Sequence, residues 1–141
     1  MSLGDMRILS VRQPWASLIA HGYKDVENRK WMPRELGRIA IHASLIWSTL
    51  GEQYAQRLNV PQYVINMARH SRGRIVGTVE IAEIKSESTS GWYIDGHYAW
   101  MLKEPEPLWS EPVKGRLQFW KAPNLGIEYH PSIESPTNLA P

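Results

Sequence analysis

The chain has no cysteine, and this absence excludes several kinds of protein at once. Disulfide frameworks, iron–sulfur clusters and thiolate zinc sites all require that residue. There is also no run of 18 apolar residues, and the N-terminus has no long apolar stretch that would direct export. We therefore expect a cytoplasmic protein that does not enter a membrane. The histidines show no metal-binding spacing, so the sequence predicts no metal and no cofactor.

A strong excess of either charge is also lacking, because the formal net charge of the 141 residues is only +2. The positive charge is nevertheless concentrated near the start. Residues 7–38 hold seven basic and three acidic residues, whereas residues 39–141 hold nine basic and ten acidic ones. Phenylalanine occurs once, against seven tryptophans and six tyrosines. These numbers favour a local basic and aromatic site over a uniformly basic surface.

Periodicity predicts a mixed fold in which strands dominate. Five strands are expected, at 6–11, 38–43, 74–84, 98–102 and 114–121, and helices at 14–21, 46–58 and from 61 to about 68. Within 38–43, Ile39, Ile41 and Ala43 should face the core, while His42 lies on the more polar side. Short strands joined by proline-rich connections favour a small barrel, with its helices inserted in the first half, over a parallel α/β sheet.

The densest group of polar and aromatic residues lies between Leu9 and Trp31. Pro14 suits the start of a helix and Gly22 its end. Beyond Gly22, one continuous strand would put Glu27 and Arg29 on one face and Lys24 on the other, whereas a turn near Lys24 would remove that separation. Both alternatives are open from the sequence. The residues predicted to bind a ligand are Arg12, Gln13, Trp15, Lys24, Glu27, Asn28, Arg29 and Trp31.

Gly22, Lys24, Glu27 and Arg29 form the pattern G-x-K-x-x-E-x-R, preceded by SVRQPWASLI. Together with GRIAIHA, YAWMLKEPEPL and PVKGRLQFW, they resemble the ASCH domain family over roughly residues 7–121. This resemblance implies an α+β fold, a PUA-like β-barrel of about five to six strands with two or three helices. We expect the domain to cover residues 6–123, followed by a loosely held tail over residues 124–141.

The resemblance implies binding of RNA, or of a modified nucleoside or nucleotide, in a basic and aromatic cleft, with DNA as a further candidate. Arg12, Lys24 and Arg29 would contact phosphate or ribose, and Trp15 or Trp31 would stack on a base. Some relatives of the family look like amidohydrolases acting on acylated cytidine, and others like ribonucleases. The alternative is therefore a metal-independent hydrolase in which Lys24 transfers a proton, assisted by Glu27 or His42. Those amidohydrolases have threonine where this chain has Glu27, which favours binding.

Overall fold

The computed structural model describes residues 3–128, and it is an α+β structure made mostly of strands. Three short helices interrupt the strands in the first half of the chain, as the periodicity predicts. In chain order the elements are β1 (Ile8–Gln13), α1 (Trp15–Ala20), β2 (Val26–Arg29), β3 (Gly37–Trp47), α2 (Thr49–Arg57), α3 (Gln62–Arg69), β4 (Ile75–Lys85), β5 (Tyr98–Pro107), β6 (Trp109–Ser110), β7 (Phe119–Trp120) and β8 (Ile127–Glu128).

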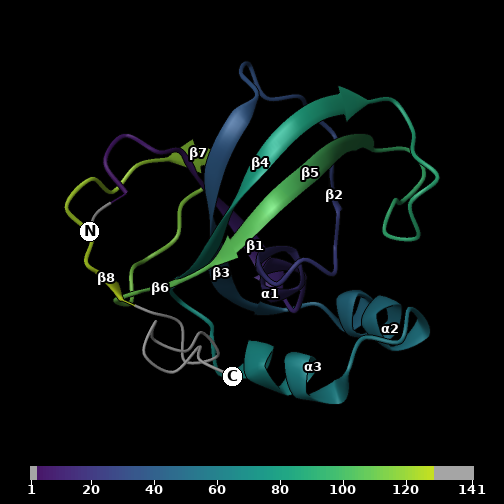
Figure 1. Cartoon of the computed structure of the whole chain (residues 1–141), viewed down its shortest axis with the longest axis horizontal. Coiled ribbons are helices and arrows are strands. Elements are labelled where there is room, and N and C mark those ends of the chain that lie inside the picture. The colour runs from purple at the N-terminus through teal and green to yellow at the C-terminus, as the bar shows by residue number, and fades with distance from the viewer. Residues whose placement is uncertain (1–2, 129–141) are drawn as a thin grey trace, which may run out of the picture.

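Six strands form one sheet in the order β2-β5-β4-β3-β1-β7, and β6 pairs with β8 in a second, two-stranded sheet. The pair β1–β3 is parallel, whereas the other pairs of the large sheet are antiparallel. Figure 1 shows α1 lying under the strands, with α2 and α3 together at the lower right. Within residues 3–128, no strand pair joins β2 to β7. Instead Arg29 of β2 reaches β1, where its Nη2 donates to the carbonyl oxygen of Ser10 at 3.1 Å.

The core lies on both faces of β3. The predicted alternation is confirmed, because Ile39, Ile41 and Ala43 belong to the main apolar cluster, together with Trp100. The opposite face, on which His42 lies, is buried as well, so β3 is covered on both faces: the exposed fraction of His42 is 2%. The reason is non-local, since the returning segment 108–127 brings a third apolar cluster onto this side of the sheet.

Three element boundaries differ from those expected. β3 continues to Trp47, so the helix expected from Ile46 begins only at Thr49. The Ser48 side chain caps this helix by accepting a hydrogen bond from the Gly51 N–H. β5 continues to Pro107, beyond the expected end at residue 102. β2 pairs only with the first four residues of β5, so the later part of β5 is an edge strand paired with β4 alone among the described strands. Prolines are tolerated there because no second strand needs their missing N–H groups. The last strand expected at 114–121 is reduced to β7.

The predicted tail is described only at its start, over residues 124–128. β8 pairs in antiparallel register with β6, and Ile127 packs against the third apolar cluster, so ordered contacts continue past residue 124. Residues 129–141, which make up most of the predicted tail, lie outside the described residues. The domain boundary at residue 123 stays a prediction. No helix in the described part of the chain is both long and apolar enough to cross a membrane.

Candidate functional site

The site is built where α1 turns into β2. Gly22 follows the helix with a φ of 83°, a left-handed conformation that glycine adopts at little cost. The backbone N–H groups of Tyr23 and Lys24 then both donate to the carbonyl oxygen of Leu18, at 2.9 Å each. This turn ends before β2 begins at Val26. It therefore settles the open alternative, because the chain turns immediately before Lys24 and the Lys24 side chain comes to the same side as Glu27.

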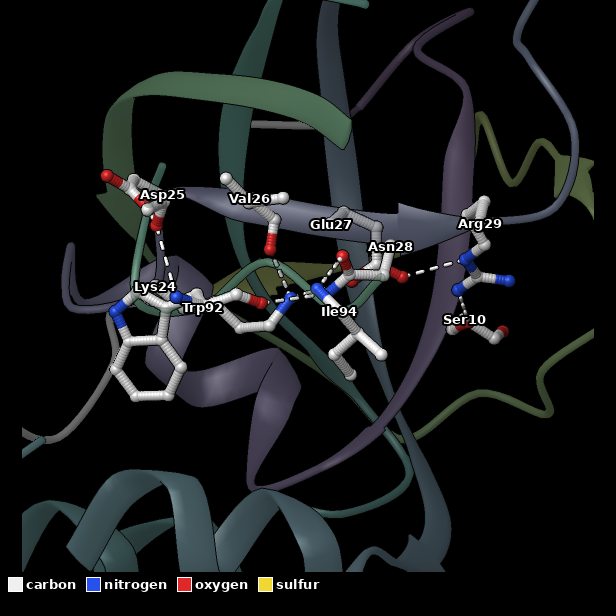
Figure 2. Close-up of polar contacts among 10 residues, drawn as sticks. Ser10, Lys24, Asp25, Val26, Glu27, Asn28, Arg29, Trp92 and Ile94 are labelled. Atoms are coloured by element: carbon white, nitrogen blue, oxygen red, sulfur yellow. Dashed lines mark hydrogen bonds and ion pairs between the residues drawn. The ribbon is translucent and has the colours of Figure 1, made fainter. Parts of the chain in front are cut away.

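Lys24 is buried together with its charge. Its side chain is 2% exposed, and Nζ donates to Glu27 Oε1 at 3.0 Å and to the carbonyl oxygen of Val26. Nζ also lies 5.1 Å from the ring centroid of Trp15, a cation–π contact. Burial lowers the pKa of Lys24 below its ordinary value, and the charge of Glu27 opposes that effect. Figure 2 shows the lysine directed into this group of residues.

Glu27 links the two cations. Its Oε1 accepts from Lys24, and its Oε2 accepts from Arg29 Nε at 2.7 Å, although the side chain is only 8% exposed. Burial by itself raises the pKa of Glu27, but the charges and hydrogen bonds of Lys24 and Arg29 outweigh burial and lower it. Glu27 is therefore an ionised carboxylate held between two cations, and the three side chains together carry one net positive charge.

Arg29 is the most accessible of the three. Its side chain is 25% exposed, and it is anchored on two sides by Glu27 Oε2 and by the carbonyl oxygen of Ser10. A guanidinium has five N–H donors, so these two bonds leave three. An arginine fixed in this way presents a preformed fork to a phosphate or to the edge of a base.

Aromatic side chains form one wall of the site. Trp15 meets Tyr54 and Trp92 edge to face, with ring centroids 5.5 Å and 6.2 Å apart. The loop that carries Trp92 is tied to β2 by Asn28, which donates to the carbonyl oxygen of Trp92 and accepts from the N–H of Ile94, both at 2.9 Å. Asn28 was predicted to bind a ligand, and the structure shows that both ends of its amide are engaged with this loop.

The remaining predicted site residues are spread over other environments. Arg12 is exposed on β1. Gln13 is fully buried, and its Oε1 accepts the backbone N–H of Ser17 at 2.9 Å, so it caps the short helix α1 from two residues before the helix begins. Trp31 packs edge to face on Trp100 and Phe119, with centroid distances of 4.9 Å and 5.7 Å.

His42 belongs to a separate buried network. Its Nδ1 is 3.1 Å from Ser10 Oγ, its Nε2 is 2.8 Å from the carbonyl oxygen of Val113, and its ring contacts that of Trp120. Burial lowers the pKa of His42. No recorded contact within residues 3–128 joins its ring directly to Lys24 or Glu27, and the link between the two networks runs through Ser10.

Sequence reasoning missed two residues that shape the site. Ser10 anchors Arg29 through its carbonyl oxygen, while its hydroxyl accepts from Trp120 Nε1 at 3.2 Å. Trp92 lies in a polar loop without periodicity, and its contact with Trp15 spans 77 positions of sequence. Neither role leaves a local signal, because both depend on segments far apart in the chain. Within the described residues, no group of three or more acidic or histidine side chains could hold a metal ion.

Comparison with known proteins places these residues in a familiar context. The chain is similar to activating signal cointegrator 1 of Homo sapiens, with 27% identity over 130 residues, and to that of Mus musculus, with 26%. These matches cover 80% of this chain but only 22% of either relative. A crystal structure of a mutant of the ZmASCH protein from Zymomonas mobilis matches with a TM-score of 0.46 and 17% identity, covering 81% of this chain and 77% of that one.

The sequence model of the ASCH domain matches residues 9–120. That range runs from β1 to β7, so it contains the six-stranded sheet except Ile8, and the Lys24–Glu27–Arg29 network. The match extends over most of the chain, and the chain belongs to the ASCH domain family.

Proposed function

We propose that the chain binds RNA, or a nucleotide-containing ligand, at the edge between β1 and β2. The observation that carries this proposal is that Arg29 is held by both Glu27 and Ser10, is partly exposed, and keeps three N–H donors for a ligand. Membership of the ASCH family supports the RNA class of ligand. A guanidinium held in this way meets a phosphate with little loss of side-chain entropy, because the fold has already fixed its orientation.

The charge balance of the site also suits an anionic ligand. A lone carboxylate would repel phosphate, but Glu27 is neutralised by two cations at 3.0 Å and 2.7 Å. Arg12 adds an exposed positive charge on β1, the strand to which Arg29 is bonded. Lys24 is too deeply buried to meet a phosphate in this conformation, so we assign it the role of positioning Glu27 and hence Arg29.

We further infer that the six-stranded sheet curves into the PUA-like barrel that the resemblance implies. Two contacts between its ends support the closure. Arg29 of β2 bonds to β1, and Trp31, just beyond β2, touches Phe119 of β7. These contacts bring the two ends of the sheet together through side chains, and they leave the binding edge beside Arg29.

The test is RNA binding by Arg29→Lys, measured by fluorescence anisotropy against the matched control Arg72→Lys. Arg72 is exposed, and its Nη1 donates to the carbonyl oxygen of Leu45. Lysine keeps the charge of Arg29 but has three donors on a single atom, so it lacks the planar fork that holds Glu27 and Ser10 while presenting further donors to a phosphate. We expect at least tenfold weaker binding for Arg29→Lys, corresponding to about 1.4 kcal/mol, and no change for Arg72→Lys. Equal affinities of the two variants, or no RNA binding by the unmodified protein, would refute the proposal.

A metal-independent hydrolase is the second candidate, favoured by the burial of Lys24. A desolvated lysine with a lowered pKa, beside a carboxylate, is an environment suited to proton transfer. The measurement is product formation from RNA or from N4-acylcytidine in the presence of EDTA, by the unmodified protein and by Lys24→Met. Turnover that Lys24→Met abolishes, while the variant stays folded, would establish catalysis. Absence of product with both substrates would leave binding as the function.

A further inference from the structure

A second charged pocket lies beyond Trp31, away from the Lys24 network. Its volume is about 770 Å³, and its lining includes Arg7, Trp31, Arg34, Arg38, Phe119 and Lys121. These residues come from the segment before β1, the connection between β2 and β3, the start of β3, and the strand β7 with its flanks. Neither Lys24, Glu27 nor Arg29 lines this pocket, so it is a separate feature of the surface.

Two of its cations are fixed by the fold. The guanidinium of Arg7 lies 4.6 Å from the ring centroid of Phe119, and its Nη2 donates to the carbonyl oxygen of Leu36 at 3.2 Å. Arg38 donates from Nη1 to Thr78 Oγ1 and from Nη2 to the carbonyl oxygen of Glu104, both at 2.9 Å. Arg38 also forms an ion pair with Glu104, with 3.7 Å between Nη2 and Oε2, whereas Arg7 takes part in no ion pair within the described residues.

The other two cations of the pocket are exposed. Within residues 3–128, neither Arg34 nor Lys121 takes part in an ion pair. The lining also contains Asp5 and Glu35, and Glu104 pairs with Arg38 from outside it, so four cations stand against three carboxylates. The balance is positive, and the two exposed cations are available to a ligand.

The positive surface continues into a neighbouring pocket of about 370 Å³. This pocket shares Lys121 with the first one and adds Lys114 and Arg116. Both added residues are exposed, and no acidic residue occurs between 114 and 121. The two pockets form one basic strip along the segment that ends in β7, with the ring of Trp31 at its other side.

We propose that this basic strip binds the sugar–phosphate backbone of the RNA that flanks the nucleotide at Arg29. The inference rests on the proposed function and extends it. Trp31 is two residues beyond Arg29, so the strip begins where the first site ends. A series of exposed cations beside an aromatic ring suits a single strand, whose repeating phosphates meet the cations while a base contacts the ring.

The geometry favours a polymeric ligand over a single phosphate. The strip is divided between two pockets, and its exposed cations are spread along the chain: Arg34 lies between β2 and β3, whereas Lys114, Arg116 and Lys121 lie at successive positions along the segment around β7. A free phosphate would contact one of these groups, whereas a strand can contact several in turn. Each phosphate contact to a single strand makes the slope of log affinity against log salt concentration steeper by about 0.7. At 0.1 M salt, each contact therefore raises the affinity about fivefold relative to 1 M salt.

The experiment compares an RNA of about four nucleotides with one of about sixteen, a range that single-strand sites cover. We expect Arg34→Ala/Lys121→Ala to bind the longer RNA roughly 25-fold more weakly, with a salt slope smaller by about 1.4. The shorter RNA, confined to the Arg29 site, should bind unchanged. The control Arg57→Ala/Arg72→Ala removes two exposed arginines outside both pockets and should leave both affinities unchanged.

The outcomes separate the two proposals. If the double variant matches its control on the longer RNA while Arg29→Lys still weakens binding, the strip is refuted and the proposed function stands. If the unmodified protein binds neither RNA, the proposed function fails and the strip fails with it. If a polyglutamate peptide binds more tightly than the longer RNA, and that binding is lost in Arg34→Ala/Lys121→Ala, the strip is a site for acidic protein segments and the RNA assignment is wrong.

Discussion

Glu27 is the residue on which the buried charges depend, and Glu27→Gln removes its charge while keeping its shape. In the folded protein the carboxylate contacts Lys24 Nζ at 3.0 Å and Arg29 Nε at 2.7 Å. An amide oxygen can still accept a hydrogen bond, but it cannot balance two positive charges. The side chain of Lys24 is only 2% exposed, so water cannot take over the role of the carboxylate.

The expected loss follows from the cost of leaving a buried charge without its partner. Removing one partner of a buried ion pair destabilises a protein by about 3–5 kcal/mol. Domains of this kind have free energies of unfolding of about 5–15 kcal/mol, so Glu27→Gln should cancel a large part of the stability. At roughly 3 °C per kcal/mol, the midpoint of thermal unfolding should fall by about 10 °C.

The assay is urea unfolding at neutral pH of a double-mutant cycle. Its members are the unmodified protein, Glu27→Gln, Lys24→Met and the double variant. Lys24→Met removes the buried cation that Glu27→Gln leaves unbalanced, so the double variant should lose at least about 1 kcal/mol less than the sum of the single variants. A loss below about 0.5 kcal/mol for Glu27→Gln, or strictly additive single variants, would refute the buried network.

Two further predictions concern the sheet. Burial lowers the pKa of His42 from its ordinary 6.5, so the stability contributed by neutral His42 is fully present above pH 6.5 and is lost as the pH falls through the folded pKa. His42→Asn should therefore flatten the pH dependence of the free energy of unfolding, measured in urea, over that window. Parallel pH profiles of the two proteins would contradict this prediction. A β-carbon on Gly77 would lie 2.7 Å from Ala20 Cβ and 2.8 Å from the Glu106 carbonyl oxygen, so Gly77→Ala should lower the free energy of unfolding by about 1–3 kcal/mol. The control Gly126→Ala, whose β-carbon would meet contacts of 3.4 Å or more, should be near neutral. Equal urea midpoints for the two variants would refute the prediction for Gly77.

The sequence predicts those parts of the fold that depend on near neighbours. The alternation at Ile39, Ile41 and Ala43 identifies the core face of β3, and Gly22 marks the end of α1. The burial of His42 has no such local sign, because it results from Val113 and neighbouring residues that return from about 70 positions away. Local pattern thus indicates which residues form an element, and long-range contacts decide which of its faces are covered.

The candidate site shows the same division. Lys24, Glu27 and Arg29 are close in sequence, so their assembly was predictable once a turn at Lys24 was allowed. Their individual roles were not, because those roles depend on which hydrogen-bonding groups the fold already occupies. Gln13 and Asn28 have polar side chains suited to a ligand, yet Gln13 bonds to α1 and Asn28 to the loop of Trp92.

Within the motif, Lys24 and Glu27 therefore fix the position of Arg29, and Arg29 is the residue that can contact a ligand. Lys24, the residue with the strongest sequence signal, donates inward to Glu27 and to the carbonyl oxygen of Val26. Glu27 passes that constraint to Arg29, which keeps N–H donors for a ligand. A binding defect in Lys24→Met would then arise from displacement of Arg29 and accompany a loss of stability. The double substitution Arg34→Ala/Lys121→Ala, by contrast, should weaken RNA binding and leave the free energy of unfolding unchanged, because both side chains are exposed.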